Sequence, residues 1–288
     1  MGILSRRNFL CLGGPAALAA LWPATPLIAY EPQVRNQPYN TLTEEEEIAL
    51  GRKFAAEYEK KVEIIDNPVF DHYLNRLVKR LGDASQRPHW PFQVKVANLA
   101  AVNAQAIPGG IIFVNRGLLD FAQDENELAG VVGHEVGHVV ARHTTNQLVL
   151  NFIARNLYER VKKNVLLNND VIGRLIETLG GPVVLLAQLK YSRENESEAD
   201  MLGFYEMLRA GWNPAGLMRF FERMERAGGA SNLFQVMLSD HPASSERAAA
   251  IRREMNTVKI TAPPFSQPFE FRTLKAALRV LPPPPKSR

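Results

Sequence analysis

The arrangement of apolar and polar residues predicts a helical chain interrupted by one short sheet. After an extended lead at residues 30–42, Thr43 and Glu46 have the spacing of a capping box, which predicts a helix to about Lys60. Pro68 begins a second helix, in which apolar residues recur at helical spacing. Each of these two helices is therefore expected to bury one face.

Alternating residues then predict three short strands. They are expected at 92–97, 101–107 and 111–114, with a turn at 108–110 before the last strand. Residues 144–190 return to a helical pattern, but their apolar residues do not form one uninterrupted span of about 20 residues. Packing in the core is therefore favoured for this segment over contact with a membrane surface.

The strongest chemical signal is a His-Glu-x-x-His motif that begins at His134. Asp124 and Glu127 precede it with capping-box spacing, which predicts that the motif lies on a helix. On a helix, His134 and His138 lie one turn apart on one face and can share a Zn²⁺ ion at about 2.0–2.1 Å. Glu135 points about 100° away, from where it can reach a zinc-bound water as the general base.

Small residues accompany the two histidines on the same helical face. Gly130, Gly137 and Ala141 leave this face with little apolar surface to bury, and they let another backbone approach closely. The alternative is a chance match, in which the histidines are ordinary core or surface residues. The chain has six histidines, and we expect a chance match about once in a hundred such cases.

A second segment offers three carboxylates that can complete a zinc site: Glu194, Glu196 and Glu198. A catalytic zinc needs a third protein ligand and an open fourth position. Glu196 shares a small-residue face with Ala199 and Gly203, whereas Glu198 points nearly opposite, so Glu196 is the predicted ligand. Asp200 is placed to hydrogen-bond a ligating histidine or to act near the leaving group. Without the first motif, this cluster would indicate a solvated acidic helix face.

The second predicted strand is a candidate substrate site. It precedes the histidine helix, so its edge is expected beside the zinc, with Asn103, Ala104, Gln105 and Ala106 as the edge residues. An exposed edge can pair with an extended peptide through main-chain hydrogen bonds. The alternative is an ordinary hairpin with no role in substrate binding, and spacing alone does not separate the two.

Together these motifs resemble those of the zinc endopeptidases related to the CAAX prenyl protease, HtpX and the mitochondrial Oma-type proteases, and most of all their soluble periplasmic members such as BepA. The resemblance runs from about Thr43 to Met255 and includes matching residues at 103–114, 117–119, 191–193, 241–242 and 247. It implies a zincin-like fold in which the two motif histidines and Glu196 bind zinc. It also implies that Glu135 activates water and that Asp200 has a supporting or proton-donor role.

The resemblance further suggests a latent state. In periplasmic relatives the histidine of a His-Pro loop can occupy the fourth zinc position, and His241 matches that histidine. Such a histidine would displace the catalytic water, so it would have to move before turnover. The alternative is a loop residue that precedes a helix. His72, His89 and His143 fit no pattern and are assigned no role.

The first residues resemble an export signal. Ser5 to Leu10 resembles a twin-arginine signal, an apolar stretch continues to about Leu21, and cleavage is expected near Ala29. An uncleaved membrane anchor is the alternative. A lipoprotein is disfavoured because Leu10 stands before Cys11, where a small residue is expected. Cys11 is the only cysteine, which excludes a disulfide framework.

Composition fits one globular domain with short appendages, since 46% of the 288 residues are hydrophobic and 22% are charged. Residues 1–29 are assigned to the signal, 30–255 to the peptidase domain, and 256–288 to a partly packed tail with a Pro-rich end. No 34-residue repeat follows residue 255, unlike in BepA-like proteins. The net charge of +4 without a long basic run argues against nucleic acid as a partner.

The sequence thus predicts a mainly α (α+β), zincin-like metallopeptidase with one Zn²⁺ per chain and protein or peptide substrates. Its predicted place is the periplasm or another extracytoplasmic site, and its predicted role is cleavage of exported or envelope proteins, with quality control as one option. Contact with a membrane surface and the oligomeric state stay open. The rival is a periplasmic chaperone or assembly factor with a zinc-stabilised cleft. A purely structural zinc protein is disfavoured, because structural sites usually close with four Cys or His ligands.

Overall fold

The computed structural model describes residues 32–35, 37, 40–163, 190–228, 232–241 and 245–284. Over these residues the chain is mainly helical with one small sheet, which confirms the predicted fold class. The expected export signal lies outside the described residues, as does most of the apolar segment that precedes residue 190.

Two N-terminal helices form as their patterns predict. Helix α1 spans Glu44–Glu59, and Thr43 and Glu46 exchange both hydrogen bonds of the capping box. Helix α2 spans Pro68–Asp83 and is capped by the side chain of Asn67. Because each cap satisfies amide groups that a helix start leaves free, both starts are fixed locally.

The sheet has the strand order β1-β3-β2, with β1 parallel and β2 antiparallel to β3. Its strands are β1 (Gln93–Ala97), β2 (Ala104–Ala106) and β3 (Ile111–Asn115), and the short 3-10 turn η1 (Pro108–Gly110) precedes β3. The second strand is shorter than predicted, because residues 99–103 form a bend and open loop before it. Ile112 and Val114 of β3 face the main core, whereas Phe113 packs with α1 on the opposite face. Covering on both faces explains why all of β3 is buried.

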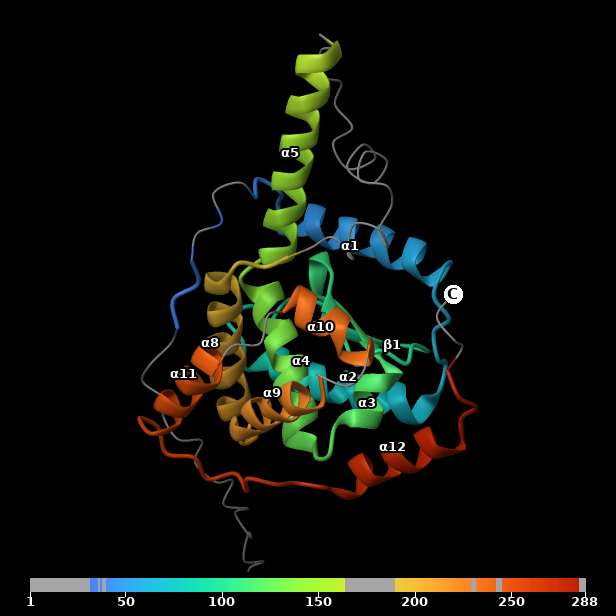
Figure 1. The fold of residues 1–288 in the computed structure, drawn as a ribbon, viewed down its shortest axis with the longest axis vertical. Helices are drawn as coiled ribbons and strands as arrows, with labels where there is room; N and C mark the ends of the chain where they lie inside the picture. The colour runs from blue at the N-terminus through green and yellow to red at the C-terminus, as the bar shows by residue number, and fades with distance from the viewer. Residues whose placement is uncertain are drawn as a thin grey trace, which may run out of the picture.

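The centre of the molecule is a pair of helices that cross closely (Figure 1). Helix α4 spans Glu125–Val140, and α8 spans Arg193–Arg209. A Cβ added to Gly137 would lie 2.7 Å from the carbonyl oxygen of Ala199, and one added to Gly203 would lie 2.8 Å from the backbone of Gly133. These glycines therefore allow the contact that the sequence predicts between two small-residue faces. Gly130 instead meets Leu217 of α9, so the predicted common face is divided between two partners.

The other helices of the described residues are α3 (Arg116–Phe121), α5 (His143–Lys163), α9 (Ala215–Gly228), η2 (Asn232–Phe234), α10 (Gln235–Asp240), α11 (Ser245–Met255) and α12 (Phe269–Val280). Helix α5 extends away from the body at the top of Figure 1. Helix α12 buries Phe271, Leu274 and Leu278 in the same core as α2 and α4. Lys275 also donates to the carbonyl oxygens at the end of α3. Residues beyond 255 are therefore bound to the body through α12.

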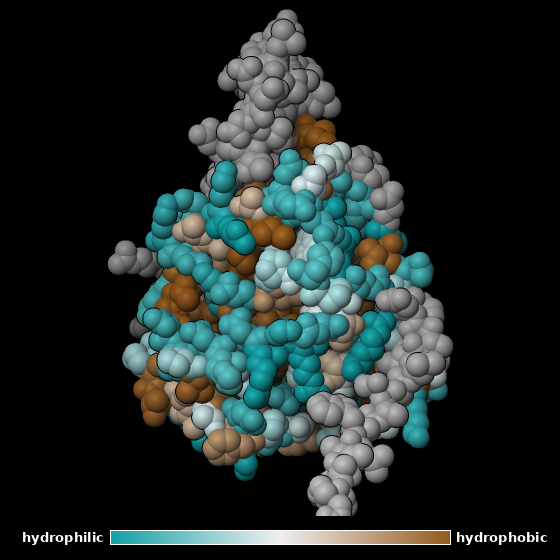
Figure 2. Space-filling view, turned by 180° about the vertical axis from the view of Figure 1, so that it is seen from behind, coloured by the Kyte–Doolittle hydropathy of each residue, from teal (hydrophilic) through white to brown (hydrophobic). Residues whose placement is uncertain are grey.

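Figure 2 shows the face opposite to that of Figure 1, where the coloured apolar residues form separate patches among hydrophilic ones. Within the described part of the chain, none of the helices combines the length and the apolar character that crossing a membrane requires. The segment 144–190 is predicted to be helical and packed in the core. Helix α5 forms its first part, and Leu148 of this helix is buried. The break at Gly180-Gly181-Pro182 lies outside the described residues.

Candidate metal centre

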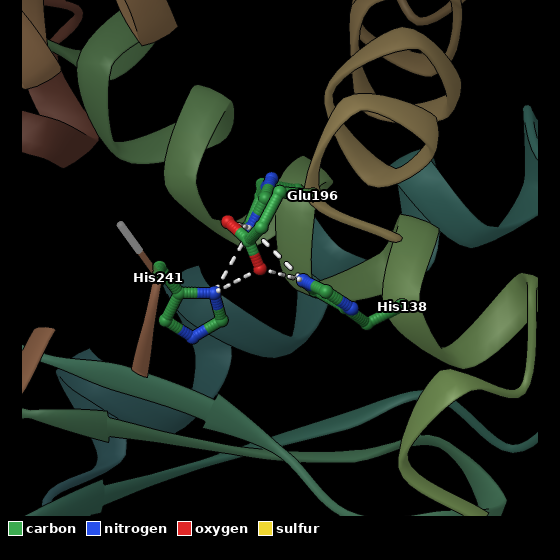
Figure 3. Close-up of side chains that lie close together, drawn as sticks. His138, Glu196 and His241 are labelled. Atoms are coloured by element: carbon green, nitrogen blue, oxygen red, sulfur yellow. Dashed lines mark hydrogen bonds and ion pairs between the residues drawn. The ribbon is translucent and has the colours of Figure 1, made fainter. Parts of the chain in front are cut away.

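Four buried side chains from three helices meet beside the sheet: His134, His138, Glu196 and His241. Each offers one nitrogen or oxygen atom, and these atoms all lie within 4.8 Å of one another. The Nε2 atoms of His134 and His138 are 3.0 Å apart, and Nε2 of His138 lies 3.2 Å from Oε1 of Glu196. Figure 3 shows His138, Glu196 and His241 pointing toward one another above the strands. The predicted ligand set and the predicted switch residue are thus neighbours.

The start of α4 positions the histidines, although its cap differs from the prediction. Asp124 accepts a hydrogen bond from the amide of Glu127 at 3.0 Å, as expected of an N-cap. The carboxylate of Glu127 does not bond back to Asp124 and accepts from the amide of Gln123 at 2.9 Å. Glu127 also pairs with Arg223 of α9. The predicted capping box is therefore half formed, because a tertiary partner draws the second carboxylate aside.

His241 reaches the cluster from the end of α10. It is the C-cap residue of α10, and its Nδ1 atom lies 3.0 Å from Oε1 of Glu196 and 3.2 Å from Nε2 of His134. Its Nε2 atom lies 3.6 Å from Oε1 of Glu135. The imidazole therefore stands between the candidate ligands and the candidate base.

Asp200 and Arg247 support the cluster from within the core, and we call this pair the core arm. Oδ1 of Asp200 lies 2.9 Å from Nδ1 of His134, as predicted for a residue one turn after Glu196. Arg247 of α11 donates to both oxygens of Asp200 at 2.6 and 2.7 Å, and its Nη1 atom lies 2.6 Å from Oε2 of Glu196. Sequence reasoning noticed Arg247 only as a matching residue and gave it no contact.

His143, to which the sequence assigns no role, makes two polar contacts at the edge of the cluster. Its Nδ1 atom lies 3.0 Å from Nδ1 of His138, and its Nε2 atom lies 3.3 Å from Oε2 of Glu198. Glu198 does leave the ligand face, as its position on α8 requires, but it meets His143 rather than solvent. The sequence signal for this contact is a histidine five positions after His138. The helical pattern alone does not predict that the two rings meet.

Glu135 is fully buried and faces the edge of the sheet. Its Oε2 atom accepts a hydrogen bond from the amide of Ala106 at 2.8 Å, and its Oε1 atom has no hydrogen-bond partner. The carbonyl of Ala106 accepts a hydrogen bond from Thr144 at 3.2 Å. Tyr191, which hydrogen-bonds Thr144, stacks on the ring of His138 at 4.1 Å. One carboxylate oxygen of Glu135 is thus anchored, and the other remains available toward the cluster.

The register of β2 determines which main-chain groups of the predicted edge point away from β3. The edge is not exposed as the sequence predicts, because Ala104 and Ala106 are both buried. Asn115 donates to the carbonyl of Asn103, and Ile107 donates to the carbonyl of Ile111. Hydrogen-bonded pairs alternate in an antiparallel ladder, so Gln105 faces β3, whereas the main-chain groups of Ala104 and Ala106 face away from it. Of the four predicted edge residues, two therefore direct main-chain groups toward the candidate site.

Burial and mutual charge shift the ionisation of the cluster. Burial raises the pKa of Glu135 and lowers the pKa of His138 well below its usual value. Burial opposes ionisation of Glu196 too, but His241 and His134 lower its pKa below the usual range. Although burial acts against a charged imidazole, Glu196 and Glu135 raise the pKa of His241 to about 9. The buried carboxylates thus favour cationic neighbours.

This set of donors fits a metal ion. Imidazole nitrogens together with one carboxylate are characteristic zinc ligands, whereas Ca²⁺ and Mg²⁺ favour all-oxygen sites. The Nδ1 atoms of both motif histidines are engaged by Asp200 and His143, which leaves their Nε2 atoms directed at the cluster centre. The group can therefore hold a metal through His134, His138 and Glu196, with His241 in reach of the fourth position.

Comparison with known proteins agrees with this geometry. The model of peptidase family M48 matches residues 68–255. The chain is 26% identical over 288 residues to the beta-barrel assembly-enhancing protease of Yersinia pestis. The aligned region covers 94% of this chain and 56% of that protein. The chain is also 35% identical over 157 residues to the mitochondrial metalloendopeptidase OMA1 of Arabidopsis thaliana. Here the aligned region covers 54% of this chain and 30% of that protein.

A third relative is similar in length. The chain is 29% identical over 214 residues to metalloprotease YcaL of Escherichia coli (strain K12), which covers 74% of this chain and 81% of that protein. In contrast, this chain spans about half the length of the beta-barrel assembly-enhancing proteases that it matches.

Proposed function

The chain belongs to peptidase family M48 and is related to metalloproteases, and we propose that it is a zinc endopeptidase of the His-Glu-x-x-His type with a glutamate as third ligand. The observation that carries the proposal is the convergence of His134, His138 and Glu196, with Glu135 beside them. In this proposal the two Nε2 atoms and the Glu196 carboxylate hold one zinc ion.

Each residue around the ligands has a distinct task. Bound zinc supplies Lewis-acid polarisation of a substrate carbonyl and makes water more acidic. Glu135 takes the proton of the attacking water with its Oε1 atom, which has no hydrogen-bond partner and lies 3.6 Å from Nε2 of His241. Ala106 fixes the orientation of the other carboxylate oxygen. Burial raises the pKa of Glu135, so it is a stronger base than an exposed carboxylate.

Asp200 is better suited to positioning than to proton donation. Although burial acts in the opposite direction, Arg247 lowers the pKa of Asp200, so the group stays a carboxylate and has no proton to give. Its hydrogen bond to Nδ1 fixes the tautomer and the direction of His134. Of the two roles that the family resemblance implies for Asp200, we therefore propose the supporting one.

The substrate is proposed to lie along Asn103–Ala106 as an added strand. The outward main-chain groups of Ala104 supply hydrogen bonds that do not depend on the side chains of the peptide. The amide and carbonyl of Ala106 are bonded to Glu135 and Thr144, so they orient the base rather than the peptide. An extended peptide in that position would pass between the sheet and the cluster, close to Glu135. This arrangement favours segments that are unfolded or unpaired in the substrate protein.

His241 is proposed to hold the enzyme latent. Its Nδ1 atom lies within 3.2 Å of both Glu196 and His134, so in this position it competes for the open corner that a water needs. Activity then requires that the end of α10 move away.

The place and substrates of the enzyme are also proposals. The twin-arginine-type start of the sequence favours export, and the names of the first relatives mention assembly of β-barrels. We therefore propose exported or envelope proteins as substrates, with quality control of their folding as the role. Because those relatives are about twice as long, their partners are not carried over.

A chaperone or assembly factor with little proteolysis is the rival, since latency through His241 could resemble an inactive site. The test is Glu135→Gln in the full chain, with Glu45→Gln in the exposed first turn of α1 as the matched control. We expect about one zinc per chain in both variants and loss of cleavage of an unfolded protein only in Glu135→Gln. Undiminished cleavage by Glu135→Gln would refute the assigned base. If His241→Ala also fails to increase cleavage while the binding of unfolded protein persists, the rival is favoured.

A further inference from the structure

We infer that His143, Glu198 and Arg35 form a hydrogen-bonded relay that orients His138 for metal binding, so that the N-terminal lead is a working part of the metal centre. We call these three residues the lead relay. The inference rests on the proposed function in one respect, which is that His138 binds the metal.

The first link fixes the tautomer of His138. Its Nε2 atom faces the cluster, 3.2 Å from Glu196 and 3.0 Å from His134. A metal takes the lone pair of that nitrogen, so the ring proton must be on Nδ1. Nδ1 lies 3.0 Å from Nδ1 of His143, which therefore accepts that proton's hydrogen bond.

The second link follows from the first. Since Nδ1 of His143 accepts, its proton is on Nε2, which donates to Oε2 of Glu198 at 3.3 Å. An ionised carboxylate can only accept hydrogen bonds, so the direction of every bond in the relay is determined from its outer end. His143 and Glu198 expose little of their side chains, 0% and 7% respectively, which shields these bonds from water.

The outer end of the relay is Arg35. Its Nε atom donates to Oε2 of Glu198 at 2.6 Å, and its main-chain amide donates to Oε1 at 2.6 Å. Its guanidinium also donates to the carbonyl of Glu194 at the start of α8. A side-chain ion pair alone at the surface contributes little. Here the backbone of the lead is bound as well, and Gln86 holds the lead again at the carbonyl of Pro32.

A local turn explains why His143 can reach His138. Helix α4 ends at its C-cap Ala141, and Arg142 then adopts a left-handed conformation with φ of 58°. That conformation is unfavourable for a residue with a Cβ, and it is offset by bonds from Arg142 to Glu47 and to the carbonyl of Leu42. The turn begins α5 at His143 and returns its ring toward α4.

The ring of His138 is thus held in two independent ways. Tyr191 stacks on it with an angle of 29° between the rings, which fixes the plane of the imidazole. The relay fixes the proton on Nδ1 of His138. It also keeps Nδ1 directed at His143 and Nε2 directed at the cluster. Partners that orient metal-bound histidines in this way typically change metal affinity by about 10–100-fold when they are removed.

The test measures the zinc affinity of the full chain by competition with a chelator. His143→Leu removes the first link, and we expect about 10–100-fold weaker zinc binding. His143→Gln can accept at one end of its amide and donate at the other, so we expect it to recover most of that loss. Recovery by Gln would not follow if His143 only filled space.

Arg35→Ala tests the outer end, with Arg193→Ala as a matched control. Arg193 is an exposed cation at the start of the same helix α8. We expect a measurable loss of zinc affinity in Arg35→Ala and none in Arg193→Ala. If His143→Leu does not fold, as judged by circular dichroism, Glu198→Gln takes its place and is expected to weaken zinc binding.

The outcomes separate this inference from the proposed function. If the wild-type protein binds no stoichiometric zinc, the proposed function fails. If the wild type binds zinc and His143→Leu or Glu198→Gln binds it equally well, only the relay is wrong. If Arg35→Ala matches Arg193→Ala, the N-terminal lead is not part of the metal centre. Loss in His143→Leu, recovery in His143→Gln and selective loss in Arg35→Ala together support the relay.

Discussion

The core arm and the lead relay support the two histidines of α4 in contrasting surroundings. Arg247 ends the core arm with 8% of its side chain exposed, whereas Arg35 ends the lead relay with 48% exposed. Asp200 and Arg247 lie inside the family match at 68–255, and Arg35 lies outside it. The same task, which is to fix an imidazole, is thus performed once entirely within the matched region and once by a relay whose outer end lies in a flanking segment.

This difference predicts different consequences of damage. A buried ion pair is costly to break, because the remaining charge stays buried without compensation. An exposed cation can be replaced by water at little cost to folding. Loss of the core arm should therefore lower the free energy of unfolding substantially, whereas loss of the outer end of the lead relay should weaken metal binding with little change in stability.

The largest effect is expected for Arg247→Ala. Asp200 and Glu196 would both lose their buried guanidinium partner, and we expect the free energy of unfolding to fall by about 3–5 kcal/mol. Denaturant unfolding of the chelator-treated protein measures this. The control is Arg252→Ala in the same helix, where a 65% exposed side chain pairs with Glu222 and about 0–1 kcal/mol is expected. Equal losses in the two variants would remove the distinction between buried and exposed pairs.

A smaller loss of stability is expected from widening the gap between α4 and α8, the two helices that carry His134, His138 and Glu196. Gly137→Ala would bring a Cβ to 2.7 Å from the carbonyl of Ala199, so we expect a loss of about 1–3 kcal/mol in unfolding free energy, and weaker zinc binding. Gly133→Ala is the matched control, because its Cβ would meet nothing closer than 3.5 Å. There, better helix propensity favours a gain of up to about 1 kcal/mol. If both variants behave alike, close approach at Gly137 is not what sets the geometry.

The smallest effect is the dependence of stability on pH through Glu198. Burial acts against its charge, but His143 and Arg35 lower the pKa of Glu198 to about 2 from an ordinary value of 4.5. A pKa that folding lowers contributes stability above the unfolded value, and that contribution is lost as the pH falls toward the folded value. In metal-free protein, the difference in unfolding free energy between wild type and Glu198→Gln should therefore shrink from pH 4.5 to pH 2. A difference that stays constant across this range would contradict the assigned contacts of Glu198.

Local chemistry made much of the fold predictable from the sequence. The capping box at Thr43, the helix start at Pro68 and the alternation in the strands depend on residues a few positions apart. The convergence of His134, His138 and Glu196 was also predictable, because helical geometry places each ligand on a small-residue face. Caps, strand alternation and the face on which a ligand lies are predictable because each depends on residues within about one helical turn.

The supports of the site were not predictable in the same way. Arg247 reaches Asp200 across 47 residues, and Arg35 reaches Glu198 across 163 residues, so no local pattern joins them. His143 fits no pattern in the sequence. Its position follows from the end of α4 at Ala141 and from the left-handed Arg142, which redirects the chain without being marked by a glycine. Tertiary competition also diverted Glu127 from its expected cap. The contacts of Arg247, Arg35 and Glu127 involve partners from distant elements, whereas that of His143 depends on an unmarked turn.

The most direct test of the central claim is the zinc content of purified, folded protein, measured by elemental analysis for the wild type and for Glu196→Ala. The matched control is Glu194→Ala, two positions earlier on the same helix and exposed. The account predicts one zinc per chain in the wild type and in Glu194→Ala, and a large loss in Glu196→Ala. A folded wild type without stoichiometric metal, or a Glu196→Ala protein that retains it, would contradict the account.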